Sequence, residues 1–203
     1  MRYRLFVLCL LLVWLASGQQ APEPDAGTVT NNTFESKFFK FRYDFPQGWS
    51  TVNDDFRTTE NRKRHEDQVQ KALARDTANT TRTQVFWTYD LLIATPKLLA
   101  ADDNPNVPHI SVWARERFST SDDPEDQVKM LAKFPNIRIL HKPEKVILSG
   151  RKFIRADFVY YNDNFEALFV TALGKYLVGF DIRGNSEKEM NDLAQTMQTL
   201  KFL

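Results

Sequence analysis

The chain has 203 residues, 42% of them hydrophobic and 26% charged, which suits one domain with a sizeable core. Because 27 lysines and arginines face 26 aspartates and glutamates, the composition lacks the basic excess of a nucleic-acid-binding protein. The only cysteine, Cys9, lies in an N-terminal apolar segment, so disulfide and thiolate chemistry are excluded for the rest of the chain.

The N-terminus has the pattern of a secretory signal peptide. Arg2 and Arg4 precede an apolar run from Phe6 to Leu15. This run of about 10 residues is too short to span a bilayer as a helix, which needs roughly 20. Small residues at 16–18 then supply a cleavage site. We therefore expect residues 1–18 to be a signal peptide, with an uncleaved membrane anchor as the alternative.

Residues 19–35 are expected to form a flexible linker, because the stretch to Thr33 is rich in Pro, Asn, Thr and Gly and lacks an apolar period. A single domain is expected over residues 36–203. Without residues 1–18, 25 basic residues face 26 acidic residues, so this exported part is close to neutral.

The run from Phe39 to Trp49 predicts the first strand and turn of the domain. Aromatic residues stand at every second position from 39 to 45 with charged residues between them, as on a half-buried strand. Pro46 and Gly48 then turn the chain. We expect the aromatic side of this strand to lie in the core.

A charged helix is expected near residues 58–75, followed by strands over Thr83–Thr95 and His109–Phe118. In the first strand, alternation places five side chains on one face: Val85, Trp87, Tyr89, Leu91 and Ile93. The second strand alternates in the same way, with apolar residues on one face and Trp113, Arg115 and Arg117 on the other.

Asp123 and Pro124 predict the start of a short helix, since aspartate is a good N-cap and proline suits the first helical position. The segment 137–148 is expected to be extended and interrupted by Pro143. Three strands joined by hairpin-type connections follow: Phe153–Tyr161, Phe165–Leu173 and Tyr176–Arg183.

A closing helix is expected after Ser186, because Ser186 and Glu189 match a capping box and an apolar stripe of helical period follows. Residues 200–202 are expected to form a short edge strand. The preceding strands are apolar on both faces, so both sides of their sheet need cover. The predicted fold class is α+β, an α/β/α sandwich on a mainly antiparallel central sheet.

Two segments resemble the PsbP/Mog1-like domain family. The opening FFKFRYDFPQGW looks like the aromatic strand and Pro-x-Gly-Trp turn that begin these domains. The ending FEALFVTALGKYLVGFDIRGNSEKEMNDLAQTMQTLKF looks like their closing hairpin, capped helix and short final strand. The resemblance covers roughly residues 36–203 in the order of elements, and it implies an α/β/α sandwich.

The resemblance also implies an accessory or adaptor module. Relatives attach to photosystem II or to the small GTPase Ran, or occur in bacterial envelope proteins such as DcrB. The signal peptide argues against a nuclear Ran-binding role, and the lack of a Ser-rich transit segment argues against a thylakoid role. The expectation that remains is a bacterial exported member, DcrB-like, in the periplasm or outside the cell.

The sequence offers no motif for catalysis, a metal or a cofactor. His65, His109 and His141 lack metal-ligand spacing, and neither a Gly-x-Ser-x-Gly sequence nor a phosphate-binding glycine loop occurs. We therefore expect no cofactor. Paired loop aspartates such as Asp122-Asp123 are assigned to solvation, with a cation site as the alternative.

Six residues on charged strand faces are candidates for a partner- or ligand-binding surface: His109, Trp113, Arg115, Arg117, Arg155 and Arg183. Charges on neighbouring strands also form cross-strand ion pairs, and tryptophans also pack in cores. A purely structural role is therefore the alternative for all six.

The first functional hypothesis is a non-enzymatic exported domain that binds another envelope or secreted protein. The second is a binding site for a small apolar molecule or lipid, suggested by 16 phenylalanines and 4 tryptophans. The third is a hydrolase-like enzyme whose site assembles from distant residues, such as His109 with an aspartate. No nucleic-acid partner is expected.

Overall fold

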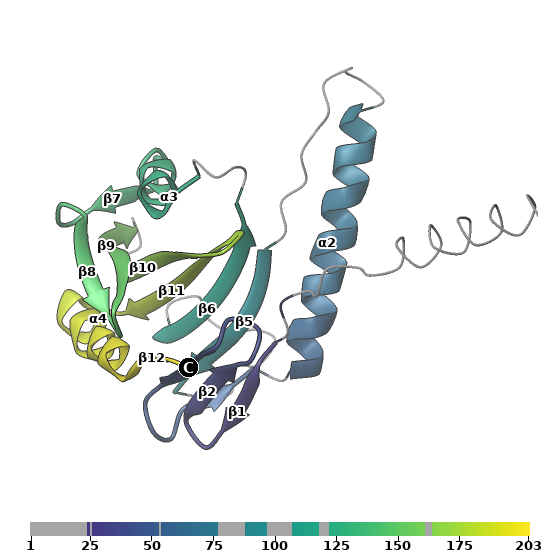
Figure 1. The fold of residues 1–203 in the computed structure, drawn as a ribbon. Helices are drawn as coiled ribbons and strands as arrows, with labels where there is room; N and C mark the ends of the chain where they lie inside the picture. Colours follow the sequence, from purple (N-terminus) through teal and green to yellow (C-terminus); the bar gives the residue numbers. More distant parts are fainter. Residues whose placement is uncertain are drawn as a thin grey trace, which may run out of the picture.

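A computed structural model describes residues 24, 26–52, 54–76, 88–96, 107–117, 122–160 and 164–203 (Figure 1). The predicted signal peptide lies outside the described residues. In chain order the elements are β1 (Thr28–Thr30), β2 (Thr33–Ser36), β3 (Phe41–Asp44), β4 (Ser50–Thr51), α2 (Asp54–Asp76), β5 (Thr88–Thr95), β6 (His109–Glu116), α3 (Pro124–Leu131), β7 (Ile137–Ile139), β8 (Glu144–Leu148), β9 (Arg151–Tyr160), β10 (Phe165–Leu173), β11 (Tyr176–Gly184), α4 (Glu187–Ala194), the 3₁₀ helix η1 (Gln195–Thr199) and β12 (Lys201–Phe202).

The central sheet has eight strands in the order β4-β5-β6-β11-β10-β9-β7, with β8 also paired to β9. Every neighbouring pair runs antiparallel. The three long strands β9, β10 and β11 form the predicted meander, and Gly174 takes a positive φ of 60° in the turn between the last two. The prediction of a mainly antiparallel central sheet is confirmed.

Helices cover both faces of this sheet, and each face has its own core. On one face, Met190 of α4 and Met197 of η1 are buried among apolar residues of β6, β10 and β11. On the other face, Val128 of α3 packs with Ile154, Leu168 and other apolar residues of β9 to β11. The α+β class with an α/β/α arrangement is therefore confirmed.

The predicted caps start α3 and α4. The Asp123 carboxylate accepts hydrogen bonds from the backbone N–H groups of residues 125 and 126. The Ser186 hydroxyl accepts from the Glu189 N–H at 3.1 Å. The Glu189 carboxylate in turn accepts from the N–H of Asn185 at 2.8 Å, one residue before the expected partner.

A second, four-stranded sheet in the order β1-β2-β3-β12 corrects the linker prediction and makes the aromatic run the third strand of the domain instead of the predicted first. Residues 28–35, predicted as part of a linker, form β1 and most of β2. The aromatic run does not join the central sheet but lies in this small sheet, facing the core under α4. The rings of Phe41 and Tyr43 lie 5.6 and 5.4 Å from the Phe180 ring of β11.

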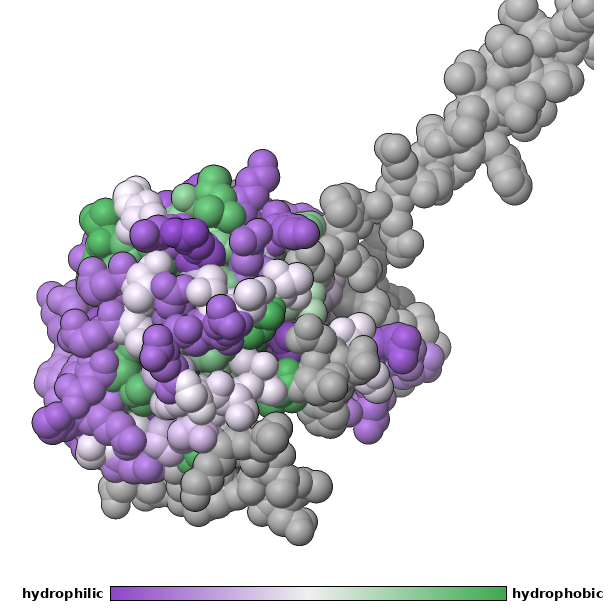
Figure 2. Space-filling model, turned by 90° about the horizontal axis from the view of Figure 1, so that it is seen from below, coloured by the Kyte–Doolittle hydropathy of each residue, from purple (hydrophilic) through white to green (hydrophobic). Residues whose placement is uncertain are grey.

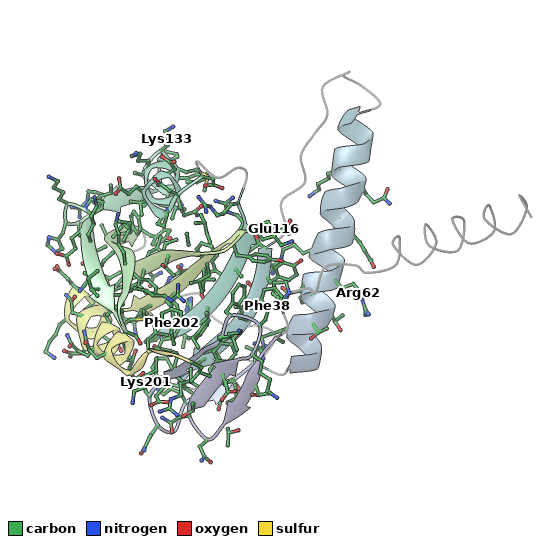
Figure 3. All side chains as sticks on the ribbon, viewed as in Figure 1. Phe38, Arg62, Glu116, Lys133, Lys201 and Phe202 are labelled. Atoms are coloured by element: carbon green, nitrogen blue, oxygen red, sulfur yellow. The ribbon has the colours of Figure 1, made fainter. Side chains whose placement is uncertain are left out.

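The aromatic residues at positions 39, 41, 43 and 45 are buried, as expected from their alternation. Phe38 and Phe202, labelled in Figure 3, flank them from the β2–β3 turn and from β12 and pack against the same core. Pairing between strands explains why the linker prediction is wrong, because backbone hydrogen bonds to β3 order β2 without a strong apolar pattern.

A β-bulge in β5 breaks the predicted alternation of that strand. The register with β6 shifts between Asp90 and Leu92. Leu91 and Leu92 are both buried in the core under α4, whereas Ile93 is only half-buried. One extra residue moves every later side chain to the other face, so the expected common face of Tyr89, Leu91 and Ile93 is wrong. Val85 and Trp87 lie outside the described residues.

Helix α2 lies beside β5 at the end of the sheet and extends past it (Figure 1). It begins four residues before the predicted start. Asn61 contacts the backbone of Asp90 twice, donating to its carbonyl at 3.1 Å and accepting from its N–H at 3.0 Å. Arg64 forms an ion pair with the Asp90 carboxylate at 2.9 Å. These bonds hold the helix against the bulged part of β5.

Candidate functional site

The odd-numbered residues of β6 and β11 carry a polar surface on the α3 side of the central sheet. Antiparallel register pairs Ser111 with Asp181, Trp113 with Gly179, and His109 with Arg183. The intervening residues of both strands are apolar and buried in the core under α4. Alternation thus gives these two strands one apolar face and one face that is polar except at Trp113, Gly179 and the buried Leu177.

A cavity of about 420 Å³ lies on this polar face, beside α3. Residues of β6 and β11 form its floor. Thr88 and Asp90 of β5 line one side, and Tyr160 of β9 and Glu166 of β10 line the other. Helix α3 borders the remaining side. The volume falls within the range of small-ligand sites, roughly 300–1,000 Å³. We refer to it as the α3 cavity.

Trp113 forms the floor of the α3 cavity because its neighbour on β11 is a glycine. A Cβ at Gly179 would lie 2.2 Å from the indole ring, which is closer than atoms can approach. The ring therefore rests directly on the β11 backbone. Its Nε1 donates a 2.9 Å hydrogen bond to Oδ2 of Asp181. A glycine inside a strand allows close packing, and here it accommodates an aromatic ring.

Glu166, Arg183 and Tyr160 form a connected group on three adjacent strands. The Arg183 guanidinium donates to Oε2 of Glu166 at 2.6 Å and 3.3 Å, and the Tyr160 hydroxyl donates to the same oxygen at 3.1 Å. The guanidinium also lies over the Tyr160 ring, 5.0 Å from its centre. Glu166 is buried, so these charge-assisted bonds compensate its desolvation.

Burial shifts several titrations at this site. It raises the pKa of the Asp181 carboxyl well above the ordinary range, and the nearby charge of Glu166 raises it further. Burial likewise raises the pKa of Tyr160, with a further contribution from Glu166. Burial lowers the pKa of His109, and the charge of Arg183 across the strand pair lowers it further.

Arg115 and Arg117 anchor the start of α3 to the end of β6. The Arg115 guanidinium donates to both carboxylate oxygens of Asp122, at 3.0 and 3.3 Å, and to Gln127 at 3.0 Å. Arg117 donates from Nε to the carbonyl of Asp122 at 2.6 Å. Both arginines thus fix the residue before the helix N-cap, and with it the wall of the α3 cavity.

The structure brings four of the six predicted surface residues to one face: His109, Trp113, Arg115 and Arg183. Arg117 lies past the end of β6. Arg155 lies on the opposite face, where it donates to Asp157 of its own strand and at 2.6 Å to Asn191 of α4. Arg183 and Glu166 form a cross-strand ion pair, as the structural alternative expected.

Sequence reasoning did not assign Tyr160, Gln127 and Ser111 to a site. Ser111 shares the alternation of Trp113 and was detectable from it. Gln127 and Tyr160 belong to other elements, and only the three-dimensional arrangement brings them to the α3 cavity.

The described parts of the chain show neither a metal site nor a membrane span. They contain no cluster of three or more histidine, cysteine, aspartate or glutamate residues suited to a metal ion. Nor is any helix there long and apolar enough to cross a membrane.

No protein-family profile matches the chain, and no curated protein matches its sequence. Among solved structures, the cyanobacterial PsbP protein (CyanoP) from Synechocystis sp. PCC 6803 has a TM-score of 0.48 at 11% identity, over 93% of this chain and 99% of that one. A Pseudomonas aeruginosa protein of unknown function has a TM-score of 0.35 at 13% identity, over 60% of this chain and 85% of that one. Membership of the PsbP/Mog1-like family stays a prediction, as do DcrB-like character and export.

Proposed function

We propose that the chain is a non-enzymatic binding domain of an exported protein and that another protein inserts a segment into the α3 cavity. The observation that carries this proposal is the polar face of β6 and β11. There Trp113 is held by its hydrogen bond to Asp181, and Arg183 lies over the ring of Tyr160 on β9, which bonds to Glu166. Tryptophan, tyrosine and arginine dominate binding energy at protein interfaces. Side chains ordered before binding lose little entropy when a partner docks.

The rim of the α3 cavity adds an apolar contact area. Met130, which lines the cavity, is 42% exposed, and Phe134 just beyond α3 is 49% exposed. By contrast, the face of the molecule shown in Figure 2 is mostly hydrophilic, with its hydrophobic residues in small separate patches. Aromatic residues, methionine and arginine are enriched at protein interfaces, and all of them gather at this cavity.

The environment of His109 favours binding over catalysis. Its Nδ1 lies 3.1 Å from the carbonyl of Val107, and its cross-strand neighbour is Arg183. A general base must stand within hydrogen-bond reach of the proton that it takes. The guanidinium beside His109 instead disfavours the imidazolium that proton uptake would create. These contacts support the non-enzymatic proposal over a hydrolase-like site.

The proposal is tested by cross-linking the tagged full chain to proteins of the envelope and secreted fractions, followed by mass spectrometry. Met130→Glu places a charge on the cavity rim and is expected to reduce capture of the partner at least about tenfold. Ile147→Glu is the matched control, because Ile147 is 68% exposed and lies on β8, outside the α3 cavity. Equal capture by both variants and the unmodified chain would overturn the proposal.

A small molecule is the second candidate occupant. Trp113, one of the residues predicted to form a partner- or ligand-binding surface, lines the cavity. Its charged lining, with Asp90, Glu166, Asp181 and Arg183, favours a polar ligand over a lipid. Native mass spectrometry of the purified full chain tests this candidate. A bound mass that Met130→Glu removes and Ile147→Glu keeps supports it, and an identical spectrum for all three proteins contradicts it.

A further inference from the structure

We infer that the group recognised in the α3 cavity is a cation, namely a lysine or arginine side chain of the docking segment, held between the Trp113 ring and the Asp181 carboxylate. This inference rests on the proposed function and specifies the chemistry of the partner.

The first argument comes from how the charges around the cavity are paired. Glu166 is neutralised by Arg183 at 2.6 Å, and Asp90 by Arg64 at 2.9 Å. Asp181 instead accepts hydrogen bonds from two uncharged donors, the Trp113 indole and the Ser111 hydroxyl. A buried carboxylate is stabilised most by a full positive charge beside it. Asp181 is thus the acid of this cavity that gains most from a cationic ligand.

The second argument is the placement of the Trp113 ring. One side of the ring rests on the backbone at Gly179, and the residue lines the α3 cavity. Tryptophan is the best aromatic partner for a cation positioned over its face. The ring and the Asp181 carboxylate are joined by a hydrogen bond, so one ligand group can contact both.

The same chemistry already occurs in the lining of the cavity, within the protein itself. The Arg183 guanidinium lies over the Tyr160 ring and bonds to the Glu166 carboxylate, whose other donor is that tyrosine. Trp113 and Asp181 repeat this combination of a ring, a carboxylate and a hydrogen bond between them, without a guanidinium in place. We expect the partner's side chain to supply the equivalent cation.

Binding of a cation is expected to release a proton from Asp181. Burial and the charge of Glu166 favour its protonated form, and a cation in the cavity favours the carboxylate. The other charged or titratable groups on this side of the sheet come from five strands: Asp90 of β5, His109 and Arg115 of β6, Tyr160 of β9, Glu166 of β10 and Arg183 of β11. Helix α3 adds only uncharged residues to the cavity, namely Gln127, Met130 and Leu131. Affinity should therefore rise with pH through the titration of Asp181.

Short peptides and the Trp113 indole N–H provide the test. Its NMR signal, assigned by its loss in Trp113→Phe, is followed in the full chain while acetylated, amidated Gly-Lys-Gly, Gly-Arg-Gly or Gly-norleucine-Gly is added. Norleucine is an uncharged side chain of similar length to lysine. We expect the lysine or arginine peptide to bind at least about tenfold more tightly than the norleucine peptide. Equal binding of the three peptides, or no binding of any, would overturn the inference.

Asp181→Asn keeps the shape of the side chain and removes its charge, so it should abolish the preference for a cationic peptide. Asp192→Asn is the matched control, because it changes the net charge by the same amount. Asp192 lies on α4, which packs on the other face of the sheet. A preference that survives in Asp181→Asn would contradict the inference. Should that variant fail to fold, the binding enthalpy of the unmodified chain is measured by calorimetry in two buffers with different ionisation enthalpies. A cationic peptide must release protons on binding near neutral pH, so the two enthalpies should differ.

Two further outcomes separate this inference from the proposed function. Equal affinity for free butylammonium and the lysine peptide would overturn the assignment to a partner's side chain. Capture of a partner that depends on Met130 but not on Asp181 would overturn the cation inference and leave the docking proposal standing.

Discussion

The two faces of the central sheet differ in what they bury. The face under α4 and the small sheet is filled by apolar side chains, with Phe180 of β11 surrounded by the rings of Phe41, Tyr43 and Phe153. The opposite face is apolar only beneath α3, and beside it lie the ion pairs and the Trp113 floor of the α3 cavity. Both faces thus contribute a core, but only the α3 face also carries a polar cavity on the strands that the core holds in place.

The largest expected effect comes from breaking the apolar face. Phe180→Ala removes a ring that is 1% exposed and leaves a cavity among aromatic neighbours, so it should lower the free energy of unfolding by about 3–5 kcal/mol. Chemical denaturation measures this loss. Phe134→Ala, at a residue that is 49% exposed, should change stability by less than about 0.5 kcal/mol. Comparable losses for the two variants would contradict the contrast between buried and exposed aromatics.

A smaller loss of stability is expected from a substitution on the α3 side of the sheet. Gly179→Ala places a methyl group against the Trp113 ring and should cost about 2 kcal/mol, because the ring must leave the sheet and its bond to Asp181. Loss of the hydrogen-bonded indole signal in NMR reports the movement. In a Trp113→Ala background the same glycine substitution should be nearly neutral, and a full cost there would show that the ring is not the obstacle.

Asp181→Asn should stabilise the domain at neutral pH. The folded chain has a raised Asp181 pKa, so between about pH 4 and that value it keeps a proton that the unfolded chain has lost. Because the folded chain holds this extra proton, the free energy of unfolding of the unmodified chain falls as pH rises through this interval. The variant lacks that slope of up to about 1.4 kcal/mol per pH unit, so it should equal the unmodified chain near pH 4 and become steadily more stable than it as pH rises. A variant that is less stable at all pH values would contradict the pKa shift.

His109→Gln should give the smallest change in stability, and only at acidic pH. The His109 pKa is lowered in the folded chain, so as pH falls below the ordinary histidine value the unfolded chain takes up its proton first. Unmodified stability therefore falls with decreasing pH until the folded pKa is passed. The variant should lack this part of the slope in denaturation series, with His141→Gln, at an exposed histidine, as control. Parallel pH profiles for all three proteins would argue against a buried, neutral His109.

The elements that the sequence predicts correctly are those with local signals. Asp123 and Ser186 bond to N–H groups two or three residues away, and the meander strands are apolar on both faces and pair without a register shift. The bulge at Asp90 follows no residue type, since it arises from pairing with β6. Strands β1 and β2 are likewise ordered by partners rather than by their own apolar pattern.

The candidate site could be predicted only within one strand. Alternation places Trp113 and Arg115 on the same face, but the position of Gly179 beneath the ring depends on the β6–β11 register. Arg155 has the same local signal as Arg183, and only its strand's place in the sheet puts it on the other face. Pairing between distant strands is not encoded in any short stretch of sequence.

The pairing of β12 with β3 also constrains when this chain can fold. Lys201 and Phe202 lie opposite Arg42 and Phe41, and the Thr199 hydroxyl bonds to Asp44, 155 residues away in the chain. During synthesis these late residues leave the ribosome long after β3. Contacts of such long range form slowly, and the small sheet cannot be complete before β12 has been synthesised.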